Sequence, residues 1–580
     1  MTMNDMTIRI GGAAGDGVES SGAGFCQALV RGGLHIFGLP DYHSRIRGGH
    51  NFFSIRISDQ PLYSHDERVH LLLALTEETI PRHQNAIVEG GAIVYDSSQI
   101  ANSEWRMADR MLLPIPLSEM AKDKAGTELA RNTVALGIAV GLTGFDLEPV
   151  ENIIRQNFAR KGQAVIDGNL AAVEAGYREG QKHAADFPFK LQRRPNAQPR
   201  MVLNGNEAFA MGALAGGCRF VAGYPMTPGS PVLEWMAGHA TRYGVVAAQV
   251  EDEIAAACAV VGAAHAGARA MAPTSGGGFC LMVEALGLAG MTETPIVIYE
   301  AQRPGPSTGL ATRTEQGDLW FVLHASHGEF PRIVLAPGTI EQAFETGWRA
   351  FNLADRYQCP VIVLADHFLA TSLRDVPPEA LDFDRVTIDR GALLSDAELD
   401  ALAEDYQRYT FTENGISSRV VPGHPKGVYS ATSDEHDQHG HIEEDAANRR
   451  WMMEKRMRKL EEARKEMHSP ALYGPQEAET TFIGWGSTYG PLRTAVDRLN
   501  AQGERANMLH FVDLWPFPAE PTAQMLTTAR RTIAVENNYS GQMADLIRMT
   551  TGHQVSSRIL KYDGRPLSPE YILENVKRET

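Results

Sequence analysis

The sequence predicts a multi-domain α/β protein, and three observations support this prediction. The chain has 580 residues, more than one hydrophobic core normally serves, so several domains are expected. Apolar, strand-like runs alternate with helical stretches along most of the chain, which is typical of parallel α/β sheets. Two helices of small and apolar residues, expected within 254–268 and 281–290, flank a glycine turn and suit a tightly packed interior.

The composition argues against several classes of function. Hydrophobic residues make up 43% and charged residues 22% of the chain, as in ordinary soluble globular proteins. The net charge of −17 argues against nucleic acid or an anionic membrane surface as a partner. The sequence shows neither a signal-peptide pattern nor an apolar run long enough to span a membrane. We therefore expect a cytoplasmic protein without a transmembrane helix.

The five cysteines are spread along the chain, and no two of them have the CxxC spacing of zinc or iron–sulfur ligands. We expect reduced, buried thiols and no metal site in this chain. The cysteines are Cys26, Cys218, Cys258, Cys280 and Cys359.

The N-terminal stretch 7–33 predicts a strand, a glycine-rich turn and a helix. Its G-G-x-x-G-x-G spacing, which includes Gly15 and Gly17, lets the backbone approach a phosphate at the helix N-terminus. A nicotinamide cofactor, another phosphate-bearing ligand and plain tight packing remain alternatives. No clean second strand with a ribose-binding acid follows, which argues against the nicotinamide cofactor. Arg45 and Arg47 flank a Gly-Gly turn nearby and either grip an anion or lie on a solvated turn.

Alternating strands and helices continue to about Gln181 and predict a parallel α/β domain. The basic, proline-containing segment that follows shows little periodicity and is expected to be a linker. A second α/β domain should begin near residue 201. Its turn 223–231 presents the hydroxyl of Thr227 on a rigid, proline-rich loop.

Arg303 lies just past the carboxyl end of the expected strand 296–301. Ligands of open α/β sheets bind at that end of the strands, and a planar guanidinium suits a carboxylate. A structural clamp is the alternative role for this arginine.

Glu251, Asp252 and Glu253 open the small-residue helix. Acids at a helix N-terminus satisfy free N–H groups and complement the dipole, so capping is the simplest interpretation. A carboxyl at the mouth of a buried helix is costly in its charged form, which makes one of the three a candidate functional group.

Residues 371–479 are charged and irregular, and they end in a strongly charged helix over 448–466. His436, His439 and His441 lie in a flexible, polar context and match no zinc spacing, so a surface arm or subunit contact is expected rather than a metal site. A last, small β/α domain should begin near residue 479.

Several of these motifs together resemble the alpha subunit of the 2-oxoacid:ferredoxin oxidoreductases, and most of all its 2-oxoglutarate members, the 2-oxoglutarate synthases. The resemblance covers nearly the whole chain in domain order. The N-terminal motifs 11-GGAAGDGV-18 and 47-RGGHNFF-53 resemble the gamma domain that many such subunits carry fused in front. The remaining motifs are 224-YPMTP-228, 251-EDEIAAACAVVGAAHAG-267, 273-PTSGGGF-279, 302-QRPGPSTG-309, 422-PGHPKGVYSATSDEHDQHGH-441 and 534-AVENNYSGQ-542.

The resemblance implies five segments in order. They are a gamma domain at 1–187 that contacts coenzyme A, a linker at 188–200, a pyrimidine-type thiamine-diphosphate-binding domain at 201–375, a charged arm at 376–478, and a C-terminal domain like that of transketolase at 479–580.

The resemblance also assigns the site residues. Thiamine enzymes have a helix-opening glutamate with a glycine nine positions later, and Glu253 with Gly262 matches this offset, so Glu253 would be the catalytic carboxyl that hydrogen-bonds the cofactor's aminopyrimidine. Tyr224, Pro225 and Gly277 would also contact the cofactor. Thr227, Arg303 and Thr312 would hold the 2-oxoacid, and Gly15, Gly17, Arg45 and Arg47 are candidate contacts of coenzyme A.

Two expected features are missing: a G-D-G…N diphosphate and magnesium motif, and cysteines for a cluster. The resemblance therefore implies a beta subunit that carries the diphosphate site, Mg²⁺ and at least one [4Fe–4S] cluster, in a dimer of alpha-beta heterodimers that reduces ferredoxin. The reaction would form succinyl-CoA from 2-oxoglutarate or run as carboxylation in a reductive, carbon-fixing cycle. Pyruvate or broad 2-oxoacid specificity, a non-oxidative thiamine lyase, and a nucleotide-binding scaffold remain alternatives.

Overall fold

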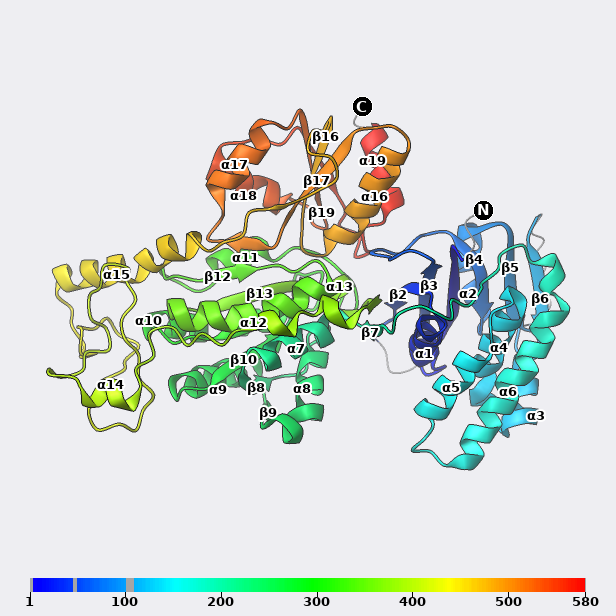
Figure 1. The fold of residues 1–580 in the computed structure, drawn as a ribbon, viewed down its shortest axis with the longest axis horizontal. Coiled ribbons are helices and arrows are strands. Elements are labelled where there is room, and N and C mark those ends of the chain that lie inside the picture. Colours follow the sequence, from blue (N-terminus) through cyan, green and yellow to red (C-terminus); the bar gives the residue numbers. More distant parts are fainter. Residues whose placement is uncertain (1–3, 45–48, 101–108, 579–580) are drawn as a thin grey trace. The chain divides into compact units, whose positions relative to one another are not determined.

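The computed structural model describes residues 4–44, 49–100 and 109–578. The chain divides into two compact units. Unit 1 comprises 1–204, 371–380 and 568–571, and unit 2 comprises the remaining residues. The α/β fold class expected from the sequence is confirmed in both units (Figure 1). None of the described helices combines the length and apolar character that crossing a membrane requires.

Unit 1 is built on a mixed sheet, which in the described residues has eight strands in the order β6-β5-β4-β1-β3-β2-β14-β7. The strands from β6 to β1 are parallel, whereas β3, β2, β14 and β7 are joined by antiparallel pairs. The prediction of a parallel domain is therefore wrong for half of this sheet. The strands are β1 (Met6–Ala13), β2 (His35–Asp41), β3 (His50–Ser58), β4 (Val69–Ala74), β5 (Ile87–Asp96), β6 (Met111–Ile115), β7 (Met201–Leu203) and β14 (Leu373–Val376).

Two physical reasons explain the antiparallel half of the sheet. The connection between β2 and β3 is too short for the crossover that parallel strands require. Strand β14 comes from residues 373–376, far along the chain, and pairs with both β2 and β7. The stretch 201–203, expected to open the second domain, thus lies in the sheet of unit 1.

The helices of unit 1 pack closely through glycines. A Cβ at Gly137 or Gly141 of α4 would lie 2.1–2.2 Å from carbonyl oxygens of α6, and one at Gly176 of α6 would lie 2.1 Å from a carbonyl of α4. Only glycine allows such close backbone approach. The helices are α1 (Val18–Arg31), α2 (Thr79–His83), α3 (Leu117–Ala125), α4 (Arg131–Thr143), α5 (Glu148–Asn157) and α6 (Gln163–Lys182).

Unit 2 contains a parallel sheet of seven strands, counted over the described chain, in the order β18-β12-β13-β11-β10-β8-β9. Only the edge strand β18 is antiparallel. The strands are β8 (Cys218–Gly223), β9 (Val246–Gln249), β10 (Arg269–Thr274), β11 (Val297–Gln302), β12 (Ile333–Leu335), β13 (Val361–Asp366) and β18 (Asp513–Trp515); the helices are α7 (Gly205–Ala215), α8 (Ser230–Tyr243), α9 (Glu253–His265), α10 (Gly276–Met291), α11 (Leu319–His324), α12 (Ile340–Tyr357) and α13 (His367–Thr371).

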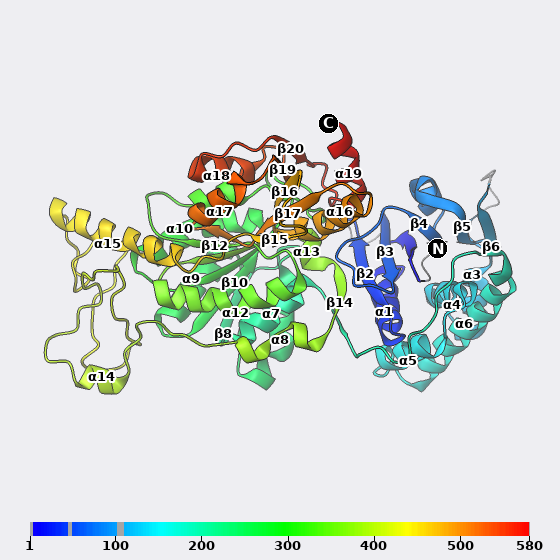
Figure 2. The same ribbon diagram turned by 45° about the horizontal axis from the view of Figure 1, so that its top comes forward.

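A smaller sheet of five strands, again over the residues described, has the order β15-β17-β16-β19-β20 (Figure 2). One hydrophobic core joins it to the larger sheet, because Ala256 and Met282 belong to the same buried cluster as Phe511 and Leu546. The elements are β15 (Ala471–Tyr473), β16 (Thr480–Trp485), β17 (Ala506–Phe511), β19 (Arg531–Glu536), β20 (Ser557–Leu560), α16 (Tyr489–Ala501), α17 (Ala519–Thr527), α18 (Gln542–Thr551) and α19 (Pro569–Arg578).

The charged segment forms an arm of unit 2 with two α-helices in its described residues, α14 (Asp396–Asp400) and α15 (Ala446–Arg464). In both views the irregular chain runs from α14 back to the far end of α15 (Figures 1 and 2). Buried charges anchor α15: Lys455 and Lys459 donate to the carboxylate of Glu293, and all three side chains are at most 2% exposed.

The expectation that all three histidines of the arm lie in a flexible, polar context is wrong for His436. Its side chain is buried, and its ring packs 4.1 Å from that of Tyr409. The main chain folds back at this point, since Asp437 and His441 are joined by a backbone hydrogen bond. Within the described residues no cluster of three or more His, Cys, Asp or Glu is arranged to hold a metal ion.

Candidate active site

The candidate site of unit 2 forms where the carboxyl ends of four neighbouring strands meet. β11, β10, β8 and β9 are adjacent in the sheet. The loops after β8, β10 and β11 carry Thr227, Gly277 and Arg303, and α9 with Glu253 follows β9. Loops at this edge of a parallel sheet face a common crevice, so residues far apart in sequence converge.

Glu253 is the first residue of α9, and Asp252 caps this helix by accepting a hydrogen bond from the backbone N–H of Ala255 at 2.7 Å. The capping interpretation is therefore confirmed for Asp252, whereas Glu251 is exposed one position earlier. Glu253 is only 3% exposed, and its Oε1 has no hydrogen-bond partner among the described residues. A buried, unpaired carboxyl oxygen is costly, which indicates that the missing partner is a ligand.

The glycine turn Gly276–Gly278 opens α10 beside this carboxyl. A Cβ at Gly278 would lie 2.7 Å from Glu253 Oε1 and 2.2 Å from Thr274 Oγ1. A Cβ at Gly277 would lie 4.0 Å from an Nη of Arg303. The turn therefore touches both candidate groups, and at Gly278 a larger residue would displace Glu253.

Arg303 is 8% exposed and donates from Nη1 to the backbone oxygen of Thr227 at 2.8 Å. Burial lowers the pKa of Arg303, and the neighbouring Glu253 partly restores it. The guanidinium stays charged in either case. The structure thus places Arg303 with Glu253, Gly277 and Thr227, an arrangement in which a cation and a shielded carboxyl face the same region.

The remaining expected residues lie around this group. Thr312 is buried in the loop after β11, and its backbone oxygen accepts a hydrogen bond from Arg313 at 3.3 Å. Tyr224 and Pro225 are exposed at the end of β8. Gly262 is exposed on α9, with no other atom within 4 Å of an added Cβ, so the nine-residue offset that singled out Glu253 does not reflect packing inside this chain.

Two acids of the site were missed by sequence reasoning. Glu300 is fully buried within β11, and Asp318 lies at the N-cap of α11. Burial and the charge of Asp318 raise the pKa of Glu300 well above its ordinary value, and burial also raises the pKa of Asp318. The signal in the sequence was a glutamate inside an otherwise apolar strand.

The glycine-rich loop of unit 1 opens a second cavity, of about 590 Å³, which Gly15, Gly17, Tyr42 and Phe52 help to line. Gly17 has a left-handed conformation (φ 72°) and precedes α1. Asp16 fixes the loop, because its carboxylate accepts from the backbone N–H of Ala13 at 2.8 Å. Arg45 and Arg47 lie outside the described residues.

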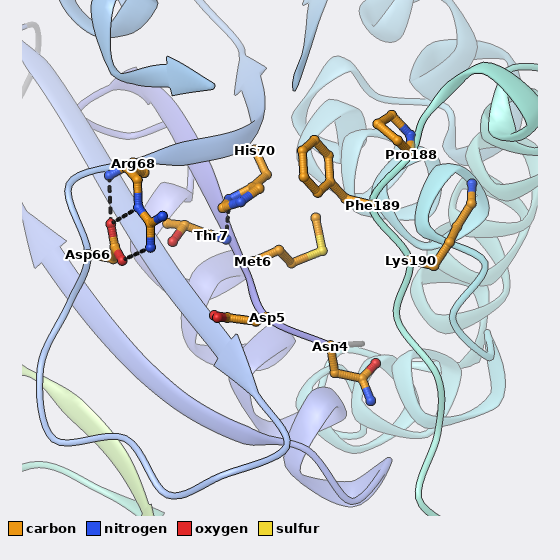
Figure 3. Close-up of a pocket in the computed structure, with 10 residues that line it drawn as sticks. All are labelled: Asn4, Asp5, Met6, Thr7, Asp66, Arg68, His70, Pro188, Phe189 and Lys190. Carbon is orange, nitrogen blue, oxygen red and sulfur yellow. Dashed lines mark hydrogen bonds and ion pairs between the residues drawn. The ribbon is translucent and has the colours of Figure 1, made fainter. Parts of the chain in front are cut away.

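A further cavity of about 330 Å³ lies at the opposite, amino-terminal ends of β1 and β4 (Figure 3). Its charged groups make internal contacts: Arg68 pairs with Asp66 at 2.7 Å, and Lys190 donates to the backbone oxygen of Leu142 at 3.1 Å. His70 accepts from the backbone N–H of Thr7 at 3.0 Å (Figure 3). These contacts explain the polar lining without a ligand.

Comparison with family models accounts for most of the chain. Residues 7–179 match "Pyruvate ferredoxin/flavodoxin oxidoreductase", residues 211–456 match "Pyruvate flavodoxin/ferredoxin oxidoreductase, thiamine diP-bdg", and residues 478–572 match "Pyruvate:ferredoxin oxidoreductase core domain II".

Individual relatives agree. The chain is 34% identical to a 2-oxoacid:ferredoxin oxidoreductase subunit alpha of Sulfolobus sp., over 97% of this chain and 95% of the relative. It is 29% identical to 2-oxoglutarate oxidoreductase subunit KorA of Mycobacterium tuberculosis, over 94% and 87%. Among solved structures, a 2-oxoglutarate:ferredoxin oxidoreductase from Magnetococcus marinus with 2-oxoglutarate, coenzyme A and succinyl-CoA bound is 32% identical, with a TM-score of 0.90 over 99% of both chains.

These matches confirm the resemblance that the motifs indicated, including the N-terminal domain fused ahead of the thiamine-diphosphate-binding domain. They also cover this chain almost completely in one domain order. The protein is therefore a member of the alpha subunits of the 2-oxoacid:ferredoxin oxidoreductases, a family of oxidoreductase enzymes.

Proposed function

We propose that this chain is the alpha subunit of an enzyme that converts 2-oxoglutarate and coenzyme A to succinyl-CoA and CO₂ and passes the electron pair to ferredoxin. The observation that carries the proposal is the unpartnered, buried Oε1 of Glu253 beside Arg303 and the glycine turn. The bound 2-oxoglutarate and succinyl-CoA of the M. marinus structure favour this substrate over pyruvate or a broad range of 2-oxoacids.

The residues present fit the pyrimidine end of thiamine diphosphate. Glu253 Oε1 is a buried acceptor, or a donor when protonated, that lacks a partner among the described residues. In the neighbouring glycine turn, a Cβ at Gly277 would meet no atom closer than 3.8 Å, which leaves room there for a ligand. Tyr224, Pro225 and Gly277 would complete the contacts. When bound, this cofactor supplies the electron sink for decarboxylation.

The roles of this chain's own groups follow from their surroundings. Glu253 would exchange a proton at Oε1, which its burial shields from water. Arg303 would bind the substrate carboxylate, with Thr227 and Thr312 beside it to orient the keto group. Arg303 already makes one hydrogen bond, to Thr227, that fixes its guanidinium.

A beta subunit would cover this site. Ile254 at the start of α9 is 51% exposed, Leu281 on α10 is 49% exposed and Tyr224 is 40% exposed. Exposed apolar side chains gathered near a catalytic group are typical of protein–protein contacts. The partner would bring the diphosphate site, Mg²⁺ and a [4Fe–4S] cluster, and two such heterodimers would associate.

Coenzyme A is the proposed ligand of the glycine-rich loop in unit 1. A Cβ at Gly15 would meet nothing within 4 Å, and α1 begins directly after Gly17, which suits a phosphate. Arg45 and Arg47 remain candidate contacts of the same phosphates by their place in the sequence.

The test of this function uses the complex of this chain with its beta subunit. We expect 2-oxoglutarate, with coenzyme A, to reduce ferredoxin with a higher kcat/KM than pyruvate or other 2-oxoacids. The rate of ferredoxin reduction and the iron content are measured together. Equal or better turnover of pyruvate contradicts the substrate, whereas an active, iron-free complex that releases an aldehyde or acyloin indicates a thiamine lyase instead.

The role of Arg303 predicts a specific kinetic defect. Arg303→Lys keeps the charge but loses the planar, two-donor geometry that a carboxylate prefers. We expect kcat/KM for the 2-oxoacid to fall about 10- to 100-fold, since a good charged hydrogen bond contributes about 1.5–3 kcal/mol, while KM for coenzyme A stays unchanged. Arg219→Lys, on the exposed side of β8, is the control and should behave as the unmodified enzyme. A defect shared equally by both substrates would contradict the assignment.

A further inference from the structure

Glu300 is fully buried and Asp318 is partly buried, and their carboxyl groups contact each other below the glycine turn. A Cβ at Gly276 would lie 2.4 Å from Asp318 Oδ2 and 3.4 Å from Glu300 Oε1. Both oxygens of Glu300 and Oδ2 of Asp318 lack a donor group among the described residues. Two ionised carboxylates have acceptors only and repel each other, so this contact requires a proton between them.

The surroundings favour one negative charge on the pair and oppose a second. The other groups acting on these carboxyls are Cys280 on α10 and Glu315 on the preceding loop, both neutral or acidic. Helix α10 begins at Gly276, next to the pair, and the dipole of a helix N-terminus stabilises a single anion. Burial makes a second charge costly. A neutral Glu300 that donates a hydrogen bond to an ionised Asp318 leaves one negative charge on the pair and avoids the second.

The pair is held rigidly. The backbone N–H of Asp318 donates to Gln302 Oε1 at 3.0 Å. Asn538, from the loop after β19, donates to the backbone oxygen of Gln316 at 3.1 Å, and Gln542, the first residue of α18, donates to that of Gly317 at 2.7 Å. These bonds hold the backbone of residues 316–318 in place and so fix the position of the Asp318 backbone next to Glu300.

The glycine turn links the pair to the candidate catalytic group. Gly276 contacts the carboxyl pair, Gly277 lies next to Arg303, and Gly278 contacts Glu253. These three residues are consecutive in the first turn of α10. A shift of the turn would therefore change the position of Glu253 and Arg303 together, and displacements of about 1 Å in an active site cost about 10²-fold in rate.

We propose that Glu300 and Asp318 share a single proton and act as a positioning pair, which holds the first turn of α10 against Glu253 and Arg303. This inference rests on the proposed function for its catalytic consequence, but the shared proton does not. Loss of the proton would place two charges under the turn and displace it. The pair acts through the turn and does not itself touch substrate or cofactor.

The first test measures the proton without using activity. Because the folded protein holds a proton on Glu300 that the unfolded chain loses near pH 4, its stabilisation is complete below that pH and is lost as the pH rises toward the raised folded pKa of Glu300. Glu300→Gln has no such proton to lose. From the unfolded pKa up to the raised folded pKa of Glu300, the unfolding constant of the unmodified chain should therefore rise by up to about tenfold per pH unit more than that of the variant.

Glu284→Gln is the matched control, because it removes an acid from an exposed position of α10, the helix whose first turn the pair contacts. It should follow the pH dependence of the unmodified chain. If Glu300→Gln does not fold, Asp318→Asn provides the same test, since removal of the neighbouring charge should lower the folded pKa of Glu300 and so end the stability loss at a lower pH. A Glu300→Gln curve parallel to that of the control, or an unshifted Asp318→Asn curve, overturns the shared proton.

The second test uses the reconstituted complex. Glu300→Gln keeps a neutral donor to Asp318, so kcat should stay within about threefold at neutral pH and persist to higher pH than in the unmodified enzyme. Glu300→Ala removes the donor and should lower kcat about 10²-fold with KM for coenzyme A unchanged. An equal loss in both variants overturns the positioning role. An inactive unmodified complex contradicts the proposed function instead and leaves the unfolding test decisive for the proton.

Discussion

Glu253→Gln should lower coenzyme-A-dependent ferredoxin reduction by the reconstituted complex by about 10²-fold or more, the usual cost of removing an acid–base group. The glutamine has nearly the same shape and fills the space beside Gly278 that Glu253 fills. It keeps a hydrogen-bonding oxygen but cannot take up or release a proton. The loss should appear in kcat, because proton transfer belongs to the chemical step rather than to substrate binding.

Glu251→Gln provides the matched control, since Glu251 is exposed two positions earlier and its removal changes the net charge equally. We expect this control to retain activity within about twofold, as exposed substitutions away from a site usually do. Unfolding temperatures of both variants establish that the fold is intact. Activity of Glu253→Gln within a few-fold of the unmodified complex would disprove the assigned role.

Glu293→Gln should destabilise the chain by about 3–5 kcal/mol, the usual cost of removing one partner from a buried ion pair. Burial raises the pKa of Glu293, but the ammonium groups of Lys455 and Lys459 outweigh it and hold that pKa below its ordinary value. Without this carboxylate two buried lysines are left with no opposite charge in the triad. Chemical denaturation of the chain at neutral pH measures the loss.

The control for this prediction is Glu461→Gln, which breaks an exposed pair with Arg464 on the same helix. Exposed pairs contribute about 0–1 kcal/mol, so its unfolding free energy should hardly change. The double variant Glu293→Gln with Lys459→Met should recover part of the loss, because an apolar replacement removes one uncompensated charge. An unfolding free energy of Glu293→Gln equal to that of the control would show that the triad does not anchor α15.

The local pattern was sufficient for much of the fold. The alternation of apolar runs and helical stretches predicted the strand that became β11, and the small-residue helices became α9 and α10. The acids at 251–253 correctly indicated a helix start. Such features depend on neighbouring residues, whose spacing is written in the sequence.

Pairing between distant segments could not be predicted in this way. The sheet of unit 1 includes β14 from residues 373–376. The local sequence pattern did not predict the antiparallel half of the sheet that β14 joins. The arm was expected to be a solvated surface, yet Lys455 and Lys459 on its charged helix are buried against Glu293. Burial of a charge depends on a partner that can come from anywhere in the chain.

The sequence by itself determined the α/β class, the order of the segments and the family, because motifs such as 251-EDEIAAACAVVGAAHAG-267 are local. It also singled out Glu253 and Arg303 as separate candidates. Only the tertiary structure decided that both contact one glycine turn, and that Glu300 and Asp318 lie beneath that turn. Convergence at the carboxyl edge of a sheet follows from strand order, which is a long-range property, and the state of a carboxyl follows from the low-dielectric surroundings that this convergence creates.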